Sequence, residues 1–466
     1  MENIYLKNYW LLNLEFIEAF SSLEYGGLPL PLLSNFYKYI DDKLKEEMMD
    51  VSFGSDLCSK EVEKKKIQIQ FERWLTPLRN PSNKKQVSGK ILLNFDYLRF
   101  SINNFLQFDS TKTLLLSRSK VKKMYNIPVI SEPDYIKNNQ RITDIIIEKA
   151  RDIFNSLNPN SAFNNSFFMK SFLSDIPIMI EKINMINLIF DKNPIISVVV
   201  GTTEDITSRV LTLIASKRGI PSFCMQHGLI MREEAFLPVF ATKQVVYGQY
   251  EKKLYLQRGV EENKIEIVGN PRFDDIFNNR YMERIKFLRR MKINLNKKIV
   301  LIATQQFNTS FYTKLATLLI QDPEIVVIIK PHPWEQLNNQ IQKYIKLSKL
   351  YPSIKCITNQ MKTYDIIANS DVVVIVNSTI GLESMLLDKP VICCNLKSLD
   401  RNYPYYEELD CLVTQDVQTT LKTVQKVLYH KISPQTTKQL RNQFLKYNYP
   451  QVIALPKLKK LINMMT

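Results

Sequence analysis

The sequence contains little glycine, 11 residues among 466, where a soluble protein usually has roughly 7%. Glycine permits positive φ and a close approach of the backbone to a ligand, so glycine-rich loops are a common way to bind the phosphates of a nucleotide. Neither the fingerprint G-x-G-x-x-G nor the phosphate loop G-x-x-x-x-G-K-[ST] occurs. A phosphate site in this chain would therefore use single glycines, cations and helix ends.

Several other common signals are also missing. The six cysteines form no C-x-x-C pair, which indicates a reducing compartment and neither a zinc site nor a disulfide framework. No D-x-D pair or H-E-x-x-H motif is present, so no metal site is predicted. No apolar run reaches the roughly 18 residues of a membrane span, and residues 1–20 lack the pattern of a signal peptide. We therefore expect a cytoplasmic protein.

The charge balance is basic, with 63 Lys and Arg against 46 Asp and Glu and a net charge of +17. This sign suits nucleic acid, an anionic membrane surface or an anionic substrate. Because no basic stripe is interleaved with aromatic residues, we expect no nucleic-acid partner. A basic helix expected around residues 457–460 makes an anionic membrane surface a candidate partner beside an anionic substrate.

β-branched runs alternate with amphipathic segments along most of the chain. Ile195–Val200, a helical segment over 206–218 and Ser222–Met225 form the first clear strand–helix–strand unit. A second alternating block begins with the strand Ile299–Ala303. Because the chain is also too long for one ordinary core, we predict an α/β fold of two Rossmann-like, doubly wound domains with a central cleft.

The predicted organisation adds helical elements at both ends of these domains. Helical periodicity appears over 32–48, a helix is expected over 334–350, and Gly269, Asn270 and Pro271 are the expected hinge between the domains. The predicted parts are a helical N-terminal elaboration over 1–88, a first Rossmann-like domain over 89–270, a second over 271–440 and a C-terminal helix over 441–466 that packs back or faces a membrane.

Polar residues follow strands of the second predicted domain, where ligands of parallel α/β sheets bind. Lys330 and His332 lie after the strand Ile325–Ile329, between two prolines that stiffen their loop. A rigid cationic loop suits a phosphate leaving group, whose negative charge grows as the bond breaks. The alternative is a proline-rich turn before a helix.

A second polar segment joins the strand Val372–Val376 to a helix. Asn377 or Ser378 can cap that helix, whose N-terminus offers N–H groups to a phosphate. Gly381 would let the backbone approach a ligand, and Glu383 could accept hydrogen bonds from a ribose. The alternative is a plain capping box over Thr379 and Glu383. The nucleotide-binding candidates are Thr304, Gln305, Lys330, His332, Asn377, Ser378, Thr379, Gly381 and Glu383.

The first predicted domain supplies the candidate bases. His227, one of three histidines, follows the strand Ser222–Met225, where a neutral imidazole can take a proton from a hydroxyl. The alternative is a structural histidine. Glu204 and Asp205 follow the strand Ile195–Val200 and are further candidates, unless they merely place negative charge at the start of a helix.

The order of these elements resembles that of the GT-B glycosyltransferases of bacterial surface-polysaccharide synthesis. The similarity covers residues 195–395 and is to capsule transferases for Kdo and sialic acid and, less closely, to the CDP-glycerol glycerophosphotransferases of teichoic acid synthesis. The elements that carry it are Gln226-His227-Gly228, Gly248, Gly269 to Asp274, Lys330-Pro331-His332-Pro333, Asn377 to Glu383 and Lys389-Pro390-Val391-Ile392.

The resemblance implies that His332, Ser378 and Thr379 contact the phosphate of the donor nucleotide and that His227 acts as base. The chain also departs from the glycerophosphotransferases, because a Gln precedes the histidine and no Asp-Tyr-Ser element replaces the segment at Asn377. These departures favour a sugar over a glycerol phosphate as the transferred group. The acidic-acidic-Gly motif of the polysialyltransferases is also missing, so the base stays open among His227, Glu204 and Asp205.

The sequence therefore predicts a metal-independent, inverting glycosyltransferase that needs no cofactor beyond its nucleotide-sugar co-substrate. The donor would be a nucleotide-activated sugar such as CMP-linked Kdo or a sialic acid, and the acceptor a surface glycan or a lipid-linked molecule. The enzyme would work in the cytoplasm, with the inner face of the membrane as a candidate site. The alternatives are a CDP-glycerol-type polyol-phosphate transferase, a nucleotide-sugar epimerase and a non-catalytic polysaccharide-binding protein.

Overall fold

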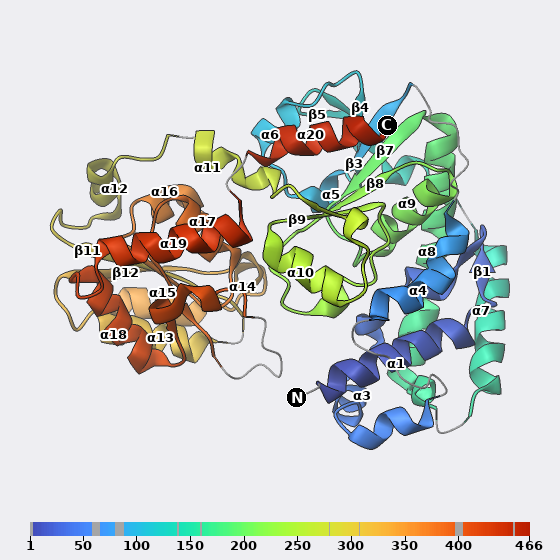
Figure 1. Ribbon diagram of the computed structural model, residues 1–466, viewed down its shortest axis with the longest axis horizontal. Helices are drawn as coiled ribbons and strands as arrows, with labels where there is room; N and C mark the ends of the chain where they lie inside the picture. The colour runs from blue at the N-terminus through green and yellow to red at the C-terminus, as the bar shows by residue number, and fades with distance from the viewer. Residues whose placement is uncertain are drawn as a thin grey trace. The chain divides into compact units, whose positions relative to one another are not determined.

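The computed structural model describes residues 3–57, 66–79, 88–137, 139–158, 161–278, 280–306, 308–396, 404–450 and 453–466. The chain divides into two compact units (Figure 1). Unit 1 comprises Met1–Arg272 and Ala454–Thr466, and unit 2 comprises Phe273–Ile453. The chain thus leaves unit 1 next to the predicted hinge and returns to it for its last helix.

Unit 1 is built on an eight-stranded sheet with the order β10-β9-β8-β7-β3-β4-β6-β5. Its strands are β3 Lys90–Asn94, β4 Thr113–Ser117, β5 Lys123–Met124, β6 Ile127–Ser131, β7 Ile195–Val200, β8 Ser222–Met225, β9 Lys243–Val246 and β10 Ile265–Ile267. All neighbours pair in parallel except β5 with β6. The order reverses between β3 and β7, as in a Rossmann fold, so the switch point lies there.

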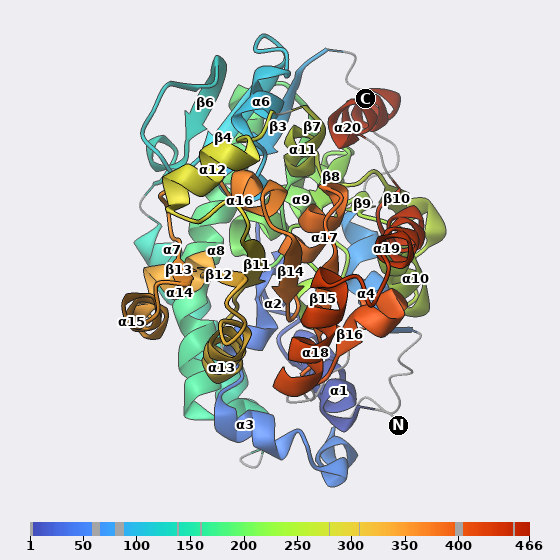
Figure 2. The same ribbon diagram turned by 90° about the vertical axis from the view of Figure 1, so that its left-hand side faces the viewer.

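Unit 2 repeats this plan in a six-stranded parallel sheet with the order β13-β12-β11-β14-β15-β16 (Figure 2). Its strands are β11 Lys298–Ala303, β12 Ile325–Lys330, β13 Ile354–Cys356, β14 Val372–Ile375, β15 Val391–Cys394 and β16 Val413–Thr414. The switch point of this sheet lies between β11 and β14. The prediction of two Rossmann-like domains is confirmed.

The strands form where the sequence is rich in Val, Ile and Leu without alternation, because helices cover both faces of a parallel sheet. The helices of unit 1 are α1 Ile4–Ala19, α2 Leu30–Leu33, α3 Asp42–Glu47, α4 Ile67–Leu75, α5 Phe95–Leu98, α6 Ile102–Leu106, α7 Gln140–Ser156, α8 Ser166–Lys192, α9 Ile206–Lys217, α10 Gln249–Gln257 and α20 Ala454–Met465. Those of unit 2 are α11 Asp275–Asn278, α12 Arg284–Met291, α13 Thr309–Leu319, α14 Pro333–Leu337, α15 Gln342–Leu350, α16 Thr363–Ala368, α17 Thr379–Leu386, α18 Val417–Leu428 and α19 Pro434–Asn448.

The N-terminal helices belong to unit 1 and do not form a body of their own. Phe16 of α1 packs edge-on against Phe168 and Phe172 of α8, with ring centroids 5.4 and 4.9 Å away. The segment 32–48, which has helical periodicity, is not one helix: it contains the end of α2, a short 3-10 helix at Phe36–Tyr39 and α3. The backbone is extended at Ser34 and Asp41, which separates these pieces.

The predicted helix over 334–350 is wrong, because it is two helices, α14 and α15. Asn339, which lies between them, has φ of 56°, in the left-handed region. Asn tolerates this conformation better than most residues and often ends a helix there. The apolar spacing continues across the break, which is why the sequence pattern did not show it.

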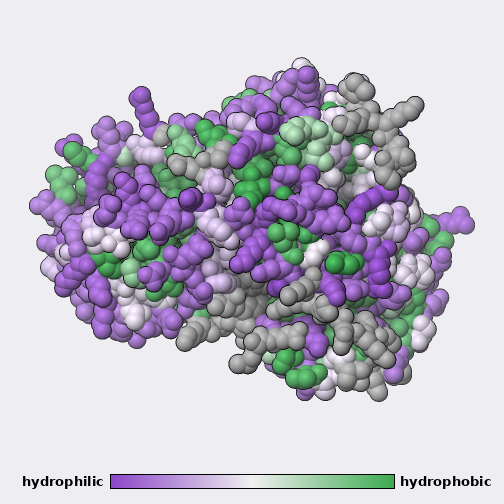
Figure 3. All heavy atoms as spheres, in the orientation of Figure 1, coloured by the Kyte–Doolittle hydropathy of each residue, from purple (hydrophilic) through white to green (hydrophobic). Residues whose placement is uncertain are grey.

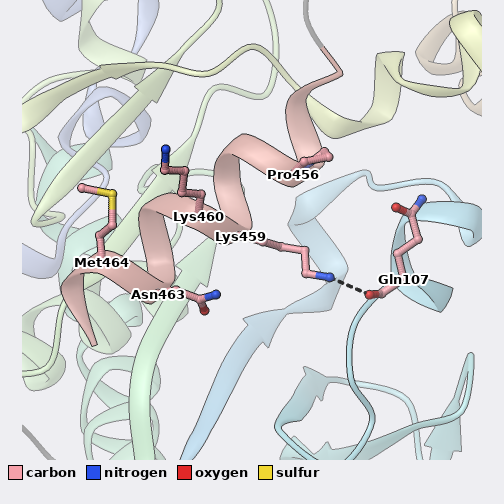
Figure 4. Close-up of a pocket in the computed structure, with 6 residues that line it drawn as sticks. All are labelled: Gln107, Pro456, Lys459, Lys460, Asn463 and Met464. Carbon is pink, nitrogen blue, oxygen red and sulfur yellow. Dashed lines mark hydrogen bonds between the residues drawn. The ribbon is translucent and has the colours of Figure 1, made fainter.

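Helix α20 packs on unit 1, although it is the last element of the chain. Its apolar face, formed by Leu455, Leu458 and Ile462, lies in one core cluster with Phe105 and Leu115. Lys459 Nζ donates a hydrogen bond of 2.9 Å to the backbone oxygen of Gln107 (Figure 4). The predicted segment 441–466 is therefore divided, because its first residues end α19 in unit 2.

Gly201 follows β7 at the switch point of unit 1. A Cβ at this position would clash with the backbone carbonyl of Tyr97, after β3, so the two strand ends approach closely. We expect Gly201→Ala to lower the free energy of unfolding by about 1–3 kcal/mol. The new methyl group would clash with a backbone carbonyl, which cannot rotate out of the way as a side chain can. Urea unfolding measures this change, and an unchanged midpoint and slope would contradict the close approach.

On the face drawn in Figure 3, hydrophobic residues form separate small groups among polar ones. Within the described residues, no helix is long and apolar enough to cross a membrane. Cys224, Cys356, Cys393, Cys394 and Cys411 are free thiols. Cys58 lies outside the described residues.

Candidate functional site

The switch point of unit 2 collects most of the predicted nucleotide-binding residues. Thr304 and Gln305 directly follow β11, and Asn377 lies two residues beyond the end of the neighbouring strand β14. The side-chain amide of Gln305 donates a hydrogen bond to the backbone oxygen of Asn377. Lys330 ends β12, and its backbone oxygen accepts from the Thr304 N–H at 3.1 Å. The three strand ends thus place these side chains at one edge of the sheet.

Lys330 is a cation set into this edge, with 9% of its surface exposed. Burial lowers its pKa, and the nearby carboxylate of Glu383 acts in the opposite direction. Glu383 lies in α17 and is itself buried. A buried cation is stabilised by anionic oxygen atoms, so an incoming phosphate would add to what Glu383 provides. In this structure the charge of Glu383 acts on Lys330, whereas the sequence analysis proposed that Glu383 accepts hydrogen bonds from a ribose.

His332 begins α14 and its proton position is fixed by the backbone. Its Nδ1 accepts a hydrogen bond of 3.1 Å from the Trp334 N–H, so a neutral ring carries its proton on Nε2. The buried carboxylate of Glu335 accepts from the His332 N–H at 2.8 Å, from the Tyr344 hydroxyl at 3.1 Å and from the Thr304 hydroxyl. Glu335, which the sequence analysis missed, therefore holds His332 and Thr304 together. The capping-box spacing of His332 and Glu335 was the available signal.

The N-terminus of α17 is more occupied than its sequence suggested. Ser378 caps it by accepting from the Ile380 N–H at 3.3 Å, and the Gly381 N–H donates to the Ser378 backbone oxygen. The hydroxyl of Tyr406 accepts from the Leu382 N–H at 3.1 Å and donates to the Ser378 backbone oxygen at 2.5 Å. A phosphate bound here would have to exchange with these partners. Tyr406 has no local sequence signal, because it comes from a distant loop.

Gly381 makes room for that tyrosine. A Cβ at Gly381 would lie 2.7 Å from Tyr406 Oη and would also clash with Ile375. The sequence analysis proposed that Gly381 lets the backbone approach a ligand. In this structure Tyr406 occupies the space that the missing side chain leaves.

A cavity of about 580 Å³ adjoins Lys330 in unit 2. Its volume is in the range of small-molecule sites. Besides Lys330, its lining comes mainly from the segment 358–363 after β13, with Arg290 of α12. The lining residues are Met282, Arg290, Lys330, Thr358, Asn359, Gln360, Met361, Lys362, Thr363 and Asp365. Three cations, Arg290, Lys330 and Lys362, outnumber its one carboxylate, Asp365, which suits a polar, anionic ligand.

In unit 1, the two acidic candidates take different positions after β7. Glu204 Oε2 lies 3.6 Å from Nε2 of His227, whereas Asp205 caps α9 by accepting from the Ser208 N–H at 2.9 Å. Burial raises the pKa of Asp205. The structure therefore brings Glu204 and His227 together and uses Asp205 to begin a helix.

His227 lies in a pocket that disfavours its charged form. Its ring stacks on Phe236 with centroids 5.1 Å apart, and 21% of its side chain is exposed. Burial and the charges of Arg99 and Arg232 lower its pKa to about 4, against a hydrogen bond with the Gly201 backbone that raises it. The imidazole is thus neutral at physiological pH, as a general base must be before it takes a proton.

Gln226, which the sequence analysis did not single out as a site residue, fixes the loop that carries His227. Its Nε2 donates to the Gly228 backbone oxygen at 2.8 Å and to Glu251 at 3.2 Å, and its Oε1 accepts from the Tyr247 N–H. Burial raises the pKa of Glu251 to about 7. The side chain of Asn270, one of the predicted hinge residues, donates to the Gln226 backbone oxygen at 2.8 Å. The hinge role itself stays a prediction.

The N-terminal helices hold the segment that follows His227. Trp10 of α1 donates through Nε1 to Glu233 at 2.9 Å, and Arg258 donates to the other oxygen of the same carboxylate at 2.6 Å. Gln68 of α4 bonds both the N–H and the backbone oxygen of Val239. The N-terminal elaboration therefore supports the loop on which the candidate base lies.

The depressed pKa of His227 has a consequence for stability. The unfolded chain takes up this proton near pH 6.5 and the folded chain near pH 4, so the contribution to stability is complete above pH 6.5 and is lost as the pH falls towards 4. We expect it to reach at most about 3 kcal/mol. Chemical unfolding of the wild type and His227→Gln across this range measures it. Equal pH slopes for the two proteins would contradict the burial of a neutral imidazole.

Within the described residues, no group of three or more His, Cys, Asp or Glu side chains is arranged to hold a metal ion. The metal independence of the reaction stays a prediction.

Residues 248–448 match a known protein family, described as CDP-Glycerol:Poly(glycerophosphate) glycerophosphotransferase. The matched segment covers less than half of the chain and includes every nucleotide-binding candidate of unit 2, but not His227 or Glu204. No curated protein matches the chain.

Solved structures share its fold at low sequence identity. A glycosyltransferase from Rickettsia africae has 12% identity and a TM-score of 0.51, covering 81% of this chain and 99% of its own. HepE from Anabaena in complex with UDP has 11% identity and a TM-score of 0.51, with 81% and 100% covered. A candidate UDP-N-acetylglucosamine 2-epimerase from Listeria monocytogenes has 12% identity and a TM-score of 0.51, with 81% and 96% covered.

These similarities agree with the two switch-point sheets described above. The chain has the GT-B fold, with two Rossmann-like domains.

Proposed function

We propose that the protein transfers a sugar from a nucleotide-activated donor to a hydroxyl of a surface glycan or lipid-linked acceptor. Unit 2 binds the donor and unit 1 supplies the base. The observation that carries the proposal is the position of Lys330, which ends β12 beside the switch point and lines the cavity of about 580 Å³. A cation at this place suits the phosphate of a nucleotide whose nucleoside occupies the cavity.

The amide-bearing segment 358–363 gives the cavity the means to recognise a base. Asn359 and Gln360 line it, and Arg290 donates to the Gln360 backbone oxygen at 3.1 Å, which fixes the segment to α12. Amide groups offer both donors and acceptors to the edge of a nucleobase. Likeness to HepE, which was crystallised with UDP, agrees with a nucleotide ligand.

The proposed reaction is a direct displacement at the anomeric carbon. His227 takes the proton from the acceptor hydroxyl, whose oxygen forms the new bond to the sugar as the bond to the donor phosphate breaks. The nucleotide leaves with the electron pair, and its growing charge is stabilised by Lys330 and the Nε2–H of His332. Glu204, 3.6 Å from His227, would stabilise the imidazolium that forms. One displacement inverts the anomeric centre.

A thermal-shift screen with CMP, CDP, UDP, GDP and dTDP tests the donor site, because a ligand that binds the folded state raises the melting temperature. We expect one nucleotide to stabilise the protein selectively and His332→Ala to abolish transfer while the protein stays folded. Full activity of His332→Ala, or no response to any nucleotide, would count against the proposal.

The second candidate is the transfer of a polyol phosphate from a CDP-linked donor, and the family match favours it. Both reactions would use the edge of the unit 2 sheet at which Lys330 and His332 lie, so the structure of unit 2 suits either donor. Product analysis separates them: consumption of CDP-glycerol with release of CMP identifies a glycerophosphate transferase, and consumption of a nucleotide sugar identifies a glycosyltransferase.

Likeness of fold to a candidate epimerase keeps that reaction as an alternative. An epimerase needs no acceptor, so incubation with the donor alone distinguishes it from a transferase. A non-catalytic polysaccharide-binding protein would change no donor under either condition.

For the localisation, we propose that the exposed face of α20 contacts an anionic membrane surface. Lys460 and Met464 lie on this face, and Met464 is 68% exposed (Figure 4). A lysine beside an exposed apolar side chain suits acidic headgroups and the acyl boundary. Such contact would bring the enzyme to a lipid-linked acceptor on the cytoplasmic face.

Co-sedimentation with vesicles of phosphatidylcholine, with and without phosphatidylglycerol, tests this contact. We expect Lys460→Glu with Met464→Ser to weaken binding to the anionic vesicles about fivefold or more. The matched control is Lys346→Glu with Leu350→Ser, both exposed on α15 of unit 2. Equal loss in the two variants would leave no specific role for α20.

A further inference from the structure

The carboxyl end of the unit 1 sheet carries arginines that the reaction outlined above does not use. Arg99, after β3, is exposed, and its Nη1 lies 3.4 Å from the backbone oxygen of His227. Arg232 donates to Glu204 at 3.0 Å, and its side chain is 40% exposed. Arg272 follows the predicted hinge, and its N–H donates to the side chain of Asn270. The guanidinium groups of Arg99 and Arg232 thus lie close to His227 and Glu204, and the charge of Arg272 acts on the same imidazole.

These cations affect one another as well as His227. Partial desolvation by the surrounding protein and the charge of Arg272 lower the pKa of Arg99, and all three arginines act to lower the pKa of His227. Like charges held this close oppose each other, and Glu204 is the carboxylate in contact with His227 and Arg232. A bound anion would turn this repulsion into attraction.

The backbone supports a fixed arrangement of the arginines. Arg99 has φ of 55°, a conformation that residues other than glycine adopt at a cost. Arg232 lies over the ring of Tyr37, with its guanidinium carbon 4.4 Å from the ring centroid. Guanidinium groups held in this way suit phosphate, which they bind through paired hydrogen bonds.

We propose that these arginines form a binding site for a phosphate group of the acceptor, next to the hydroxyl that reacts. This rests on the proposed function, because that function places the donor phosphate on Lys330 and His332 in unit 2 and the acceptor hydroxyl at His227 in unit 1. Because the donor phosphate is placed in unit 2, a phosphate bound beside His227 would be part of the acceptor. Lipid-linked and phosphate-bearing glycans are acceptors with this chemistry.

Histidine-selective NMR of the full chain tests the site, because three histidines report on different places. His227 reports on unit 1 and His332 on unit 2, and His→Gln variants assign the signals. Inorganic phosphate is added at constant ionic strength between about pH 3 and 7, a range that contains the midpoint near 4 expected without phosphate. We expect it to shift the His227 signals and to raise the titration midpoint of His227 by about one pH unit or more.

Variants then assign the effect to the arginines. Arg99→Gln and Arg272→Gln should each weaken the phosphate response of His227 about tenfold. Arg151→Gln, on α7 of the same unit, removes the same charge from an exposed pair with Glu148 and should leave the response unchanged. An unchanged response in Arg99→Gln and Arg272→Gln, or a His227 that ignores phosphate, would overturn the proposal.

Two further ligands separate the sources of the phosphate. Glycerol 3-phosphate should act on His227 as inorganic phosphate does, whereas UDP should act on His332. If UDP displaces phosphate from the His227 site, the site belongs to the donor and the acceptor assignment is wrong. A protein in which His332 ignores every nucleotide while His227 still binds phosphate would instead refute the proposed donor site.

Discussion

Lys330→Met should lower kcat/KM for transfer about 10²–10³-fold, the usual effect of removing one group that stabilises a developing oxyanion. Methionine keeps the unbranched length of the lysine stem, so the packing at the end of β12 is preserved. The lost charge removes the cation on which the charge of Glu383 acts and leaves the departing phosphate without its buried partner. The variant should also lose most of the thermal stabilisation by the preferred nucleotide.

Kinetics at saturating acceptor and thermal shifts with the nucleotide measure the two effects. Lys346→Met, on the exposed side of α15, is the matched control and should behave as the wild type. If Lys330→Met kept both its activity and its nucleotide response, the edge formed by β11, β12 and β14 would not be the donor site.

His227→Gln should lower kcat about 10²–10⁴-fold, the range for loss of a general base. Unlike Lys330→Met, it should keep nucleotide binding, since His227 belongs to unit 1. The pH profile of the wild type gives a second readout. Because the pKa of His227 is lowered to about 4, the acid limb of kcat/KM should lie well below the pH of about 6.5 expected for an ordinary histidine.

Removing a positive charge near His227 should move the acid limb of the kcat/KM profile to higher pH. Arg99 lowers the pKa of His227, so Arg99→Gln should shift the acid limb upward. His430→Asn, at an exposed position with φ of 58°, is the control and should leave the profile unchanged. A wild-type limb near pH 6.5, or full activity of His227→Gln, would assign the base to another group.

The strands from Ile195 onward could be predicted because burial on both faces leaves continuous runs of Val and Ile, which only helices on both sides can cover. The breaks at Ser34 and Asn339 could not, because apolar spacing continues across them and the backbone alone changes direction. The last helix was predicted, but its return to unit 1 depends on contacts with residues far away in sequence.

For the candidate site, the sequence supplied the residues that follow strands, and the sheet order explains why they meet. The sequence alone did not indicate Tyr406, which comes from a distant loop. Nor did it indicate the arginines around His227, because Arg99, Arg232 and Arg272 lie in three separate loops with no motif in common. Gln226 is adjacent to His227 and Glu335 lies three residues after His332, but only their hydrogen bonds show that they position these histidines.

The return of α20 to unit 1 affects how the protein is made. During synthesis the whole of unit 2 leaves the ribosome before Leu455, Leu458 and Ile462 can cover Phe105 and Leu115. Until then the nascent first unit exposes part of its core, which makes this interval the one in which chaperones or aggregation compete with folding. Completion of unit 1 is thus a late event, even though most of its residues are translated first.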